Sequence, residues 1–196
     1  MPLRILDIGA GTAYIPRAAD RQMSYRAQWT VLDTNADRME LARALKPPGM
    51  RLDVLEADIR NAMPPGQPFD AVLLTFTLLE FNEHEVVLQN AADQVAPGGL
   101  LILALPDVWR DALQCAHHGG TAEALLEGSV EIPKVDKFTG KAYPFHAHRP
   151  EKVIATILQR GFHLERLERG GPIGEAFLLT FRRRAEPVTA PELKSV

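Results

Sequence analysis

The sequence predicts an α/β fold: a Rossmann-like, doubly wound sheet of about seven strands, mostly parallel, with a C-terminal antiparallel hairpin strand. Over the first 105 residues, short apolar runs typical of buried strands alternate with longer stretches typical of helices. That alternation favours parallel strands joined by helices. The last two predicted strands are joined by a Gly-Gly-Pro-Ile-Gly turn, which is short enough to join an antiparallel pair.

Each element follows from an apolar run and the residues that interrupt it. The run Phe69–Thr75 is apolar on both faces, as expected of a central parallel strand. Pro150 suits the first turn of a helix, and Gly161 suits the position after its end. The predicted strands cover residues 4–8, 28–33, 52–57, 69–75, 100–105, 162–168 and 176–183. The predicted helices cover residues 14–21, 35–45, 82–95 and 150–160.

The alternation breaks between residues 106 and 149. We expect this segment to be irregular, with helical patches at 108–115 and 121–127. Because it interrupts the fold on the carboxyl edge of the sheet, it is predicted to be an inserted substrate or lid region. Residues 1–184 then form a single domain. Residues 185–196 are rich in Pro and polar side chains and are expected to be a flexible tail.

Composition excludes several functional classes. The 196 residues carry a net charge of −3, so no overall basic field favours nucleic acid. No apolar run approaches the roughly 20 residues of a membrane helix. The single cysteine, Cys115, cannot form an internal disulfide, and no signal peptide precedes the first strand. We therefore expect a cytoplasmic location, with no nucleic-acid or membrane partner.

A glycine-rich turn follows the first strand. Asp7, Gly9, Gly11 and Ala13 lie in the run Leu-Asp-Ile-Gly-Ala-Gly-Thr-Ala. Glycines at a strand-to-helix turn permit backbone angles closed to other residues and let the main chain lie against a ligand. The helix after them presents unpaired N–H groups. The turn is therefore a candidate ligand cradle.

Three acidic residues indicate which ligand the cradle holds. Asp33 follows Gly11 by 22 residues and ends the second strand, where its carboxylate can accept both hydroxyls of a ribose. Asp58 follows the third strand and is placed to accept from an adenine amine. Asp7 lies below the turn, where it either forms a structural hydrogen bond or helps to hold a cationic amino group. An acid beneath the turn repels phosphate, so S-adenosylmethionine fits better than NAD. Hydride-transfer activity would favour NAD instead.

The sequence resembles the class I S-adenosylmethionine-dependent methyltransferases, in their small-molecule branch. The resemblance covers roughly residues 3–105 and includes a helix led by Arg149-Pro150 with Gly161-Phe162 after it. It implies a methyltransferase that uses S-adenosylmethionine. The segments that carry it are Leu6–Ala13, Val31–Asp33, Glu56–Ile59, Phe69–Val72 with Leu78–Phe81, and Val95–Leu101. The predicted cofactor-binding residues are Asp7, Gly9, Ala10, Gly11, Asp33, Thr34, Asp58, Ile59 and Thr75.

Three features depart from the family pattern. Ala13 replaces the third glycine, and Glu80 stands where members of this branch often carry histidine. The family's helices before the first strand are missing. This last feature motivates an alternative function: a cofactor-binding subunit or scaffold whose pocket is completed by a partner or by a second copy of the chain.

The acceptor side offers three candidate catalytic residues, Tyr143, His146 and His148, in the run Tyr-Pro-Phe-His-Ala-His-Arg. A histidine here could deprotonate an acceptor as a general base, or it could be a loop residue bonded to the backbone. Thr75 and Phe76 should border the methionine moiety, with Phe76 either in the core or in the ligand wall. No metal is predicted, because the spacing matches no closed zinc pattern. The residues weighed for a metal were Cys115, His117, His118, His146 and His148.

The reaction implied is transfer of a methyl group from S-adenosylmethionine to a nucleophile on a small molecule. The Asn/Asp-Pro-Pro-aromatic motif of nucleic-acid amino methylation is absent, because Thr75-Phe76-Thr77-Leu78 occupies that position. Neither the acceptor atom nor the substrate follows from the sequence.

Overall fold

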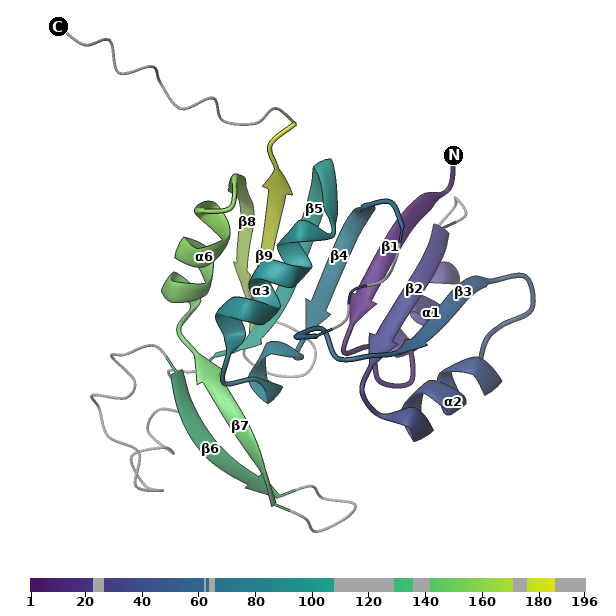
Figure 1. The fold of residues 1–196 in the computed structure, drawn as a ribbon, viewed down its shortest axis with the longest axis horizontal. Coiled ribbons are helices and arrows are strands. Elements are labelled where there is room, and N and C mark those ends of the chain that lie inside the picture. Colours follow the sequence, from purple (N-terminus) through teal and green to yellow (C-terminus); the bar gives the residue numbers. More distant parts are fainter. Residues whose placement is uncertain are drawn as a thin grey trace, which may run out of the picture.

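The computed structural model describes residues 1–22, 27–61, 63, 66–107, 129–135, 142–170 and 176–185, and only the backbone of residues 129–135 and 142–144. Figure 1 shows the arrangement of its elements. The strands are β1 (Leu3–Ile8), β2 (Ala27–Asp33), β3 (Arg51–Glu56), β4 (Phe69–Thr75), β5 (Val95–Pro106), β6 (Ser129–Val135), β7 (Ala142–His148), β8 (Phe162–Arg169) and β9 (Ala176–Arg183). The helices are α1 (Tyr14–Asp20), α2 (Ala36–Ala44), α3 (His84–Asp93), α6 (Pro150–Leu158) and the 3₁₀ turn η1 (Leu78–Glu80).

The main sheet has seven strands in the order β3-β2-β1-β4-β5-β9-β8. Strands β1 to β5 pair in parallel, whereas β9 is antiparallel to both β5 and β8. This confirms the predicted doubly wound sheet and its C-terminal hairpin. The strand order reverses beside β1, and the parallel strands all end at the lower edge in Figure 1. In such sheets ligands bind at that edge, next to the reversal.

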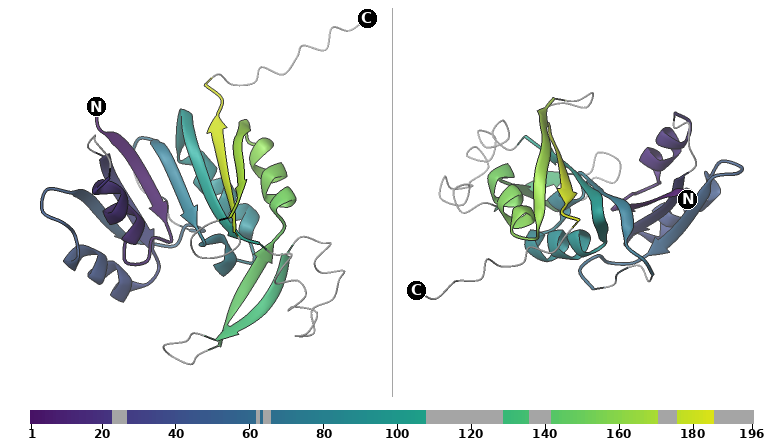
Figure 2. Two further views of the ribbon diagram at one scale, coloured as in Figure 1. Left: turned by 180° about the vertical axis from the view of Figure 1, so that it is seen from behind. Right: turned by 90° about the horizontal axis from the view of Figure 1, so that it is seen from above.

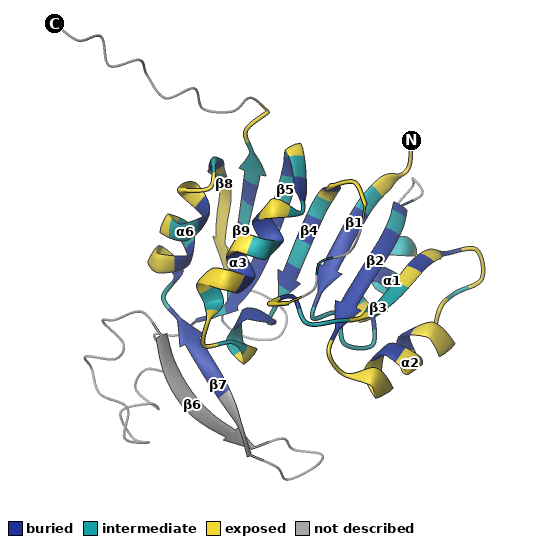
Figure 3. Cartoon of the chain, viewed as in Figure 1, coloured by how far each residue is buried: buried dark blue, intermediate teal, exposed yellow. Residues whose placement is uncertain are grey.

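Two apolar cores cover the two faces of the sheet. Alternate residues of a strand point to opposite faces, and accordingly Leu6 packs with α3 and α6 while Ile5 packs with Met39 and Ala42 of α2. Helix α3 lies in front of the sheet in Figure 1, and the view from behind in Figure 2 shows α1 on the other side. The central strands are buried along most of their length in Figure 3, as expected when both faces are covered.

Strand β5 begins earlier than predicted, at Val95 instead of Leu100. Val95 pairs with Phe69 of β4, and the register shifts before Ala71 pairs with Leu100. The Pro-Gly-Gly run expected to end a helix therefore lies inside a strand. Gly99 is required there, because a Cβ at this position would lie 2.9 Å from the carbonyl oxygen of Asp70. Helix α3 accordingly ends at Asp93.

The expectation that residues 106–149 are irregular is wrong in part. Within this segment β6 and β7 form a two-stranded antiparallel sheet. A proline opposes a proline in it, Pro133 against Pro144. Proline is disfavoured in strands but tolerated in edge strands, and both members of a two-stranded sheet are edges. Because proline is disfavoured in strands, Pro133 and Pro144 hide the strand pattern of β6 and β7 in the sequence. The helical patches predicted at 108–115 and 121–127, and residues 186–196 of the tail, lie outside the described residues.

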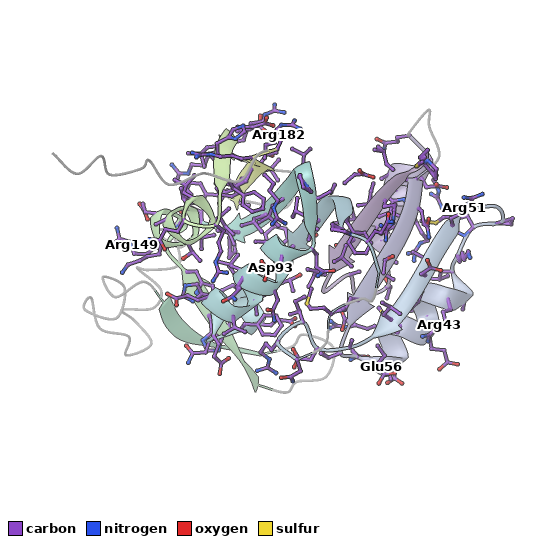
Figure 4. All side chains as sticks on the ribbon, turned by 45° about the horizontal axis from the view of Figure 1, so that its top comes forward. Arg43, Arg51, Glu56, Asp93, Arg149 and Arg182 are labelled. Carbon is purple, nitrogen blue, oxygen red and sulfur yellow. The ribbon has the colours of Figure 1, made fainter. Side chains whose placement is uncertain are left out.

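The outer edge of β3 is covered by cations from α2 and the turn after it. The guanidinium of Arg43 donates to the carbonyl oxygen of Val54 at 3.1 Å, and the ammonium of Lys46 lies 3.5 Å from the carbonyl oxygen of Leu52. At the opposite end of the sheet Arg182 pairs with Glu165 and donates to the carbonyl oxygen of Gly98. Figure 4 labels Arg43 and Arg182 at these two ends. In the described part of the chain, no helix combines the length and apolar character needed to cross a membrane.

Candidate cofactor site

A pocket opens where β1, β2 and β3 end, between the glycine-rich turn and η1. It is open to solvent and has a cavity volume of about 20 Å³. Four of the predicted cofactor-binding residues line it: Gly9, Asp33, Thr34 and Ile59. The remaining lining residues are Ile8, Leu32, Ala57, Thr77, Glu80 and Phe81. The predicted residues Asp7, Ala10, Gly11, Asp58 and Thr75 lie around it, at the same edge of the sheet.

Gly9 and Thr77 lie against each other and join the turn after β1 to the turn after β4. Gly9 has φ +68°, and a Cβ placed on it would lie 2.3 Å from Cγ2 of Thr77. The hydroxyl of Thr77 donates to the carbonyl oxygen of Ile8 at 2.8 Å, and the N–H of Gly9 donates to Leu32 at 2.7 Å. Any larger side chain at position 9 would force these two turns apart.

Asp33 is fixed by two backbone donors. One of its carboxylate oxygens accepts from the N–H of Gly11, and the other accepts from the N–H of Asn35, both at 2.9 Å. The side chain is 8% exposed and lines the pocket. A carboxylate has about four acceptor positions, so a ligand hydroxyl can still bind to either oxygen. The neighbouring Thr34 is exposed at the pocket wall.

Asp7 lies beneath the turn and is almost completely buried, with 1% exposure. Its Oδ1 atom has no hydrogen-bond partner among the described residues. Burial raises the pKa of the Asp7 carboxyl to about 7, and the negative charge of Asp33 contributes in the same direction. Oδ1 therefore makes no structural hydrogen bond to the described chain. A buried, unpartnered acceptor of this kind fits a cationic ligand group.

Asp58 does not line the pocket, and Arg60 holds its carboxylate. The guanidinium of Arg60 donates to Oδ2 of Asp58 at 2.7 Å, and the backbone N–H of Arg60 donates to Oδ1 at 2.9 Å. The side-chain hydrogen bond from Arg60 lowers the pKa of Asp58. Arg60 also lies over the ring of Phe81, 5.3 Å from its centre. The adenine contact predicted for Asp58 stays a prediction, and Arg60 would have to share the carboxylate.

The pocket wall formed by Thr77, Glu80 and Phe81 was not predicted as part of the site. Partial burial raises the pKa of the Glu80 carboxyl; the charge of Arg38 opposes this rise, and that of Asp33 adds to it. The sequence signal for this wall is the Leu78–Phe81 segment, which carries part of the family resemblance. The role of position 80 was open because Glu80 departs from the family's histidine.

Phe76, the residue after β4, has an unusual backbone. Its φ is +56°, and its N–H donates to the carbonyl oxygen of Ala104 at 3.0 Å. The side chain is partly exposed and belongs to neither of the two apolar cores. Positive φ in a bulky residue is costly and is found mainly where the surrounding structure or function requires it. Phe76 does not line the pocket either, so its role stays a prediction.

The histidines predicted for catalysis lie on β7, which packs against η1. His146 and His148 are 7% and 3% exposed. The Nε2–H of His148 donates to the carbonyl oxygen of Leu78 at 2.9 Å, the backbone-bonded alternative weighed from the sequence. Tyr143 has a described backbone only, so its side-chain role stays a prediction. None of the three lines the pocket.

Within the described residues, no group of histidine, cysteine and acidic side chains has a metal-binding arrangement. Cys115, His117 and His118 lie outside that part of the chain.

The residues of the pocket fit an adenosyl ligand with a cationic tail. Asp33 offers acceptors for ribose hydroxyls, and Leu32, Ile59 and Phe81 offer an apolar surface for a purine ring. The buried Oδ1 of Asp7, beneath the turn, is an acceptor that would suit a positive charge, and a diphosphate would meet the same carboxyl unfavourably.

Comparison with known proteins agrees with this chemistry. Residues 5–99 match the profile of a family described as "Methyltransferase domain". A ubiquinone/menaquinone biosynthesis C-methyltransferase from Chromobacterium violaceum is 28% identical over 109 residues, which cover 55% of this chain and 45% of that protein. The matched part thus spans less than half the length of that relative.

Solved structures share the fold. A SAM-dependent methyltransferase from Methanosarcina mazei superposes with a TM-score of 0.74 at 18% identity, covering 94% of each chain. The magnesium protoporphyrin IX methyltransferase of Synechocystis, with bound SAH, superposes with a TM-score of 0.66 at 16% identity, covering 93% of this chain and 74% of that chain. Residues 5–99 of this chain therefore match the methyltransferase-domain family, and the chain shares its fold with solved S-adenosylmethionine-dependent methyltransferases.

Proposed function

We propose that the protein transfers the methyl group of S-adenosylmethionine to a nucleophilic atom of a small-molecule acceptor. The observation that carries the proposal is the pocket between the glycine-rich turn and η1, with the Asp33 carboxylate in its wall. The relatives from Chromobacterium violaceum and Synechocystis are named for quinone biosynthesis and magnesium protoporphyrin IX, and both names support a small acceptor. The net charge of −3 supports the same class over nucleic acid.

The chain's own residues would hold the cofactor from three sides. Asp33 would accept the ribose hydroxyls, and Leu32, Ile59 and Phe81 would contact the adenine ring. Asp7 would face the positively charged methionine end. When bound, S-adenosylmethionine supplies a methyl carbon that its sulfonium already activates for displacement.

The protein's task is then to align the acceptor and exclude water. The segment 106–149 stays the proposed acceptor and lid region, and β7 within it packs against η1 at the pocket wall. Tyr143 and His146 stay the candidate bases. A base is needed only where the acceptor must lose a proton before the transfer.

Calorimetry tests cofactor binding. We expect S-adenosylmethionine and S-adenosylhomocysteine to bind the unmodified protein, and Asp33→Ala to weaken both by at least tenfold, on the order of 1.4 kcal/mol. Asp53→Ala is the matched control, because Asp53 is an exposed aspartate on β3. No binding at millimolar ligand, or equal affinity in Asp33→Ala, would reject the proposal.

A labelling experiment tests the acceptor class. The protein is incubated with methyl-labelled S-adenosylmethionine and a cell extract separated into small-molecule, protein and nucleic-acid fractions. Label in the small-molecule fraction supports the proposal, and label confined to protein or nucleic acid contradicts it. Sedimentation of the same sample tests the alternative in which a partner or second copy completes the pocket. A monomer that turns over the acceptor alone rules that alternative out.

A further inference from the structure

Histidines from two elements meet behind the pocket wall. His148 ends β7, and its ring centre lies 4.4 Å from that of His84, the first residue of α3. The Nε2–H of His148 donates to the carbonyl oxygen of Leu78, and this hydrogen bond is buried. His148 therefore connects the β6–β7 hairpin to the first residue of η1.

The carbonyl of Leu78 also holds η1 together. It accepts the N–H of Phe81 at 3.2 Å, while the N–H of Glu80 donates to Thr77 at 3.0 Å. A carbonyl oxygen has two lone pairs, so the bonds from Phe81 and His148 occupy both. The pocket wall includes Thr77, Glu80 and Phe81. The position of this wall thus depends on the η1 turn, and His148 fixes the Leu78 carbonyl of that turn.

The geometry does not suit His148 to proton transfer with an acceptor. Its Nε2 is occupied by Leu78, and its Nδ1 is buried without a partner among the described residues. Burial and the neighbouring His84 lower the pKa of His148 to about 4, with a smaller contribution from His146. The ring is therefore neutral at physiological pH, and its Nε2–H is held by the carbonyl of Leu78.

We propose that His148 is a positioning residue: it fixes η1, and through η1 the cofactor-facing wall of Thr77, Glu80 and Phe81. The hairpin that precedes the last helix is thereby coupled to the pocket. This deepens the proposed function and rests on it for its effect on cofactor affinity. Its structural part can be measured without any cofactor.

Two variants separate positioning from catalysis. His148→Leu removes the donor, whereas His148→Gln keeps an amide N–H near the place of Nε2 and has no titratable group. His163→Gln is the matched control, since His163 lies on β8 with half of its side chain exposed. Amide hydrogen exchange of Glu80 and Phe81 is measured in the protein without cofactor, followed by affinity for S-adenosylhomocysteine.

Positioning predicts that exchange at Glu80 and Phe81 accelerates about tenfold in His148→Leu and stays within about threefold of the unmodified protein in His148→Gln. Affinity for S-adenosylhomocysteine should follow the same order, and the pH profile of kcat should be unchanged in His148→Gln. Unchanged exchange in His148→Leu would overturn the proposal. A loss of kcat of about a hundredfold or more in His148→Gln, with normal affinity, would also overturn it in favour of a base.

Two further outcomes are distinguishable. If the unmodified protein binds no S-adenosylhomocysteine, the proposed function fails, and the exchange comparison still decides the role of His148. If His148→Leu does not fold, His148→Gln alone decides: normal exchange and affinity support positioning, and a selective loss of kcat overturns it.

Discussion

The Asp33 carboxylate accepts the N–H of Gly11 at 2.9 Å, although the two residues are 22 positions apart in the chain. The end of β2 therefore fixes the glycine-rich turn after β1 before any ligand arrives. The second carboxylate oxygen of Asp33 accepts from the N–H of Asn35. One side chain therefore orients the turn after β1 and the turn after β2. A buried carboxylate held in this way is prepared to receive hydroxyl donors with little rearrangement.

Asp33→Asn tests this arrangement. The amide keeps the shape of the side chain but turns one acceptor into an N–H₂ donor, which must face the N–H of Gly11 or of Asn35. We expect unfolding to become easier by about 1–3 kcal/mol, because one buried donor loses its partner. Urea denaturation measures this, and calorimetry should show a weaker S-adenosylmethionine complex. Unchanged stability would mean that the carboxylate does not hold the turn.

Gly9→Ala and Gly11→Ala form a matched pair. Both glycines have positive φ, +68° and +54°, but only at Gly9 would a Cβ collide with Thr77. We expect Gly11→Ala to cost about 1 kcal/mol of unfolding free energy, from the backbone conformation alone. Gly9→Ala should cost about 2–4 kcal/mol, since a steric clash is added. Equal costs in denaturant titrations would show that the contact with Thr77 carries no energy.

Asp7 gives the protein a predictable pH dependence. Raising a carboxyl pKa from 3.8 to about 7 makes the native state prefer the protonated form by roughly 4 kcal/mol. That contribution to stability is fully present below pH 4 and is lost as the pH rises to about 7. Relative to Asp7→Asn, the unmodified protein should lose stability across this window and not above it. Parallel melting curves of Asp53→Asn, an exposed control, should show no such trend.

Asp7 should also link ligand binding to protons. A cation bound beside this carboxyl favours its ionised form, so affinity for S-adenosylmethionine should rise as the pH increases through about 7. Calorimetry in buffers of different ionisation enthalpy would detect the proton released on binding. In Asp7→Asn the affinity should not change with pH. If the affinity of the unmodified protein does not change with pH either, Asp7 does not contact the ligand.

Arg60 competes for the carboxylate of Asp58. Its guanidinium contacts both oxygens, and its side-chain hydrogen bond lowers the pKa of Asp58. If Asp58 accepts from the adenine amine, Arg60→Ala should tighten S-adenosylmethionine binding by about two- to fivefold, and Asp58→Ala should weaken it. If S-adenosylmethionine binds Arg60→Ala, Asp58→Ala and the unmodified protein equally tightly, Asp58 does not contact the cofactor.

The part of the site that depends on strand ends could be predicted from the sequence. Gly9, Asp33 and Ile59 line the pocket because parallel strands place the residues after them along one edge. The family motifs supplied the order of these segments. The main sheet was predictable for the same reason, since each buried strand is a clear apolar run.

The other parts of the site and the fold depend on contacts between distant residues, which leave no periodic pattern in the sequence. Thr77 enters the site through its packing against Gly9, and Phe81 through a 3₁₀ turn too short to have a pattern. The hairpin of β6 and β7 was hidden by Pro133 and Pro144. The bond between His148 and Leu78 joins residues 70 positions apart, and only the folded chain shows it.

The cations on the outer edge of β3 bear on the aggregation of the protein. An open strand edge is a template on which another chain can add a strand, and this is how native sheets begin to aggregate. Arg43 and Lys46 engage the carbonyl groups of Val54 and Leu52, which such a chain would need. Among the described residues, two long side chains thus occupy the carbonyl groups of this edge, and we expect them to disfavour edge-to-edge polymerisation.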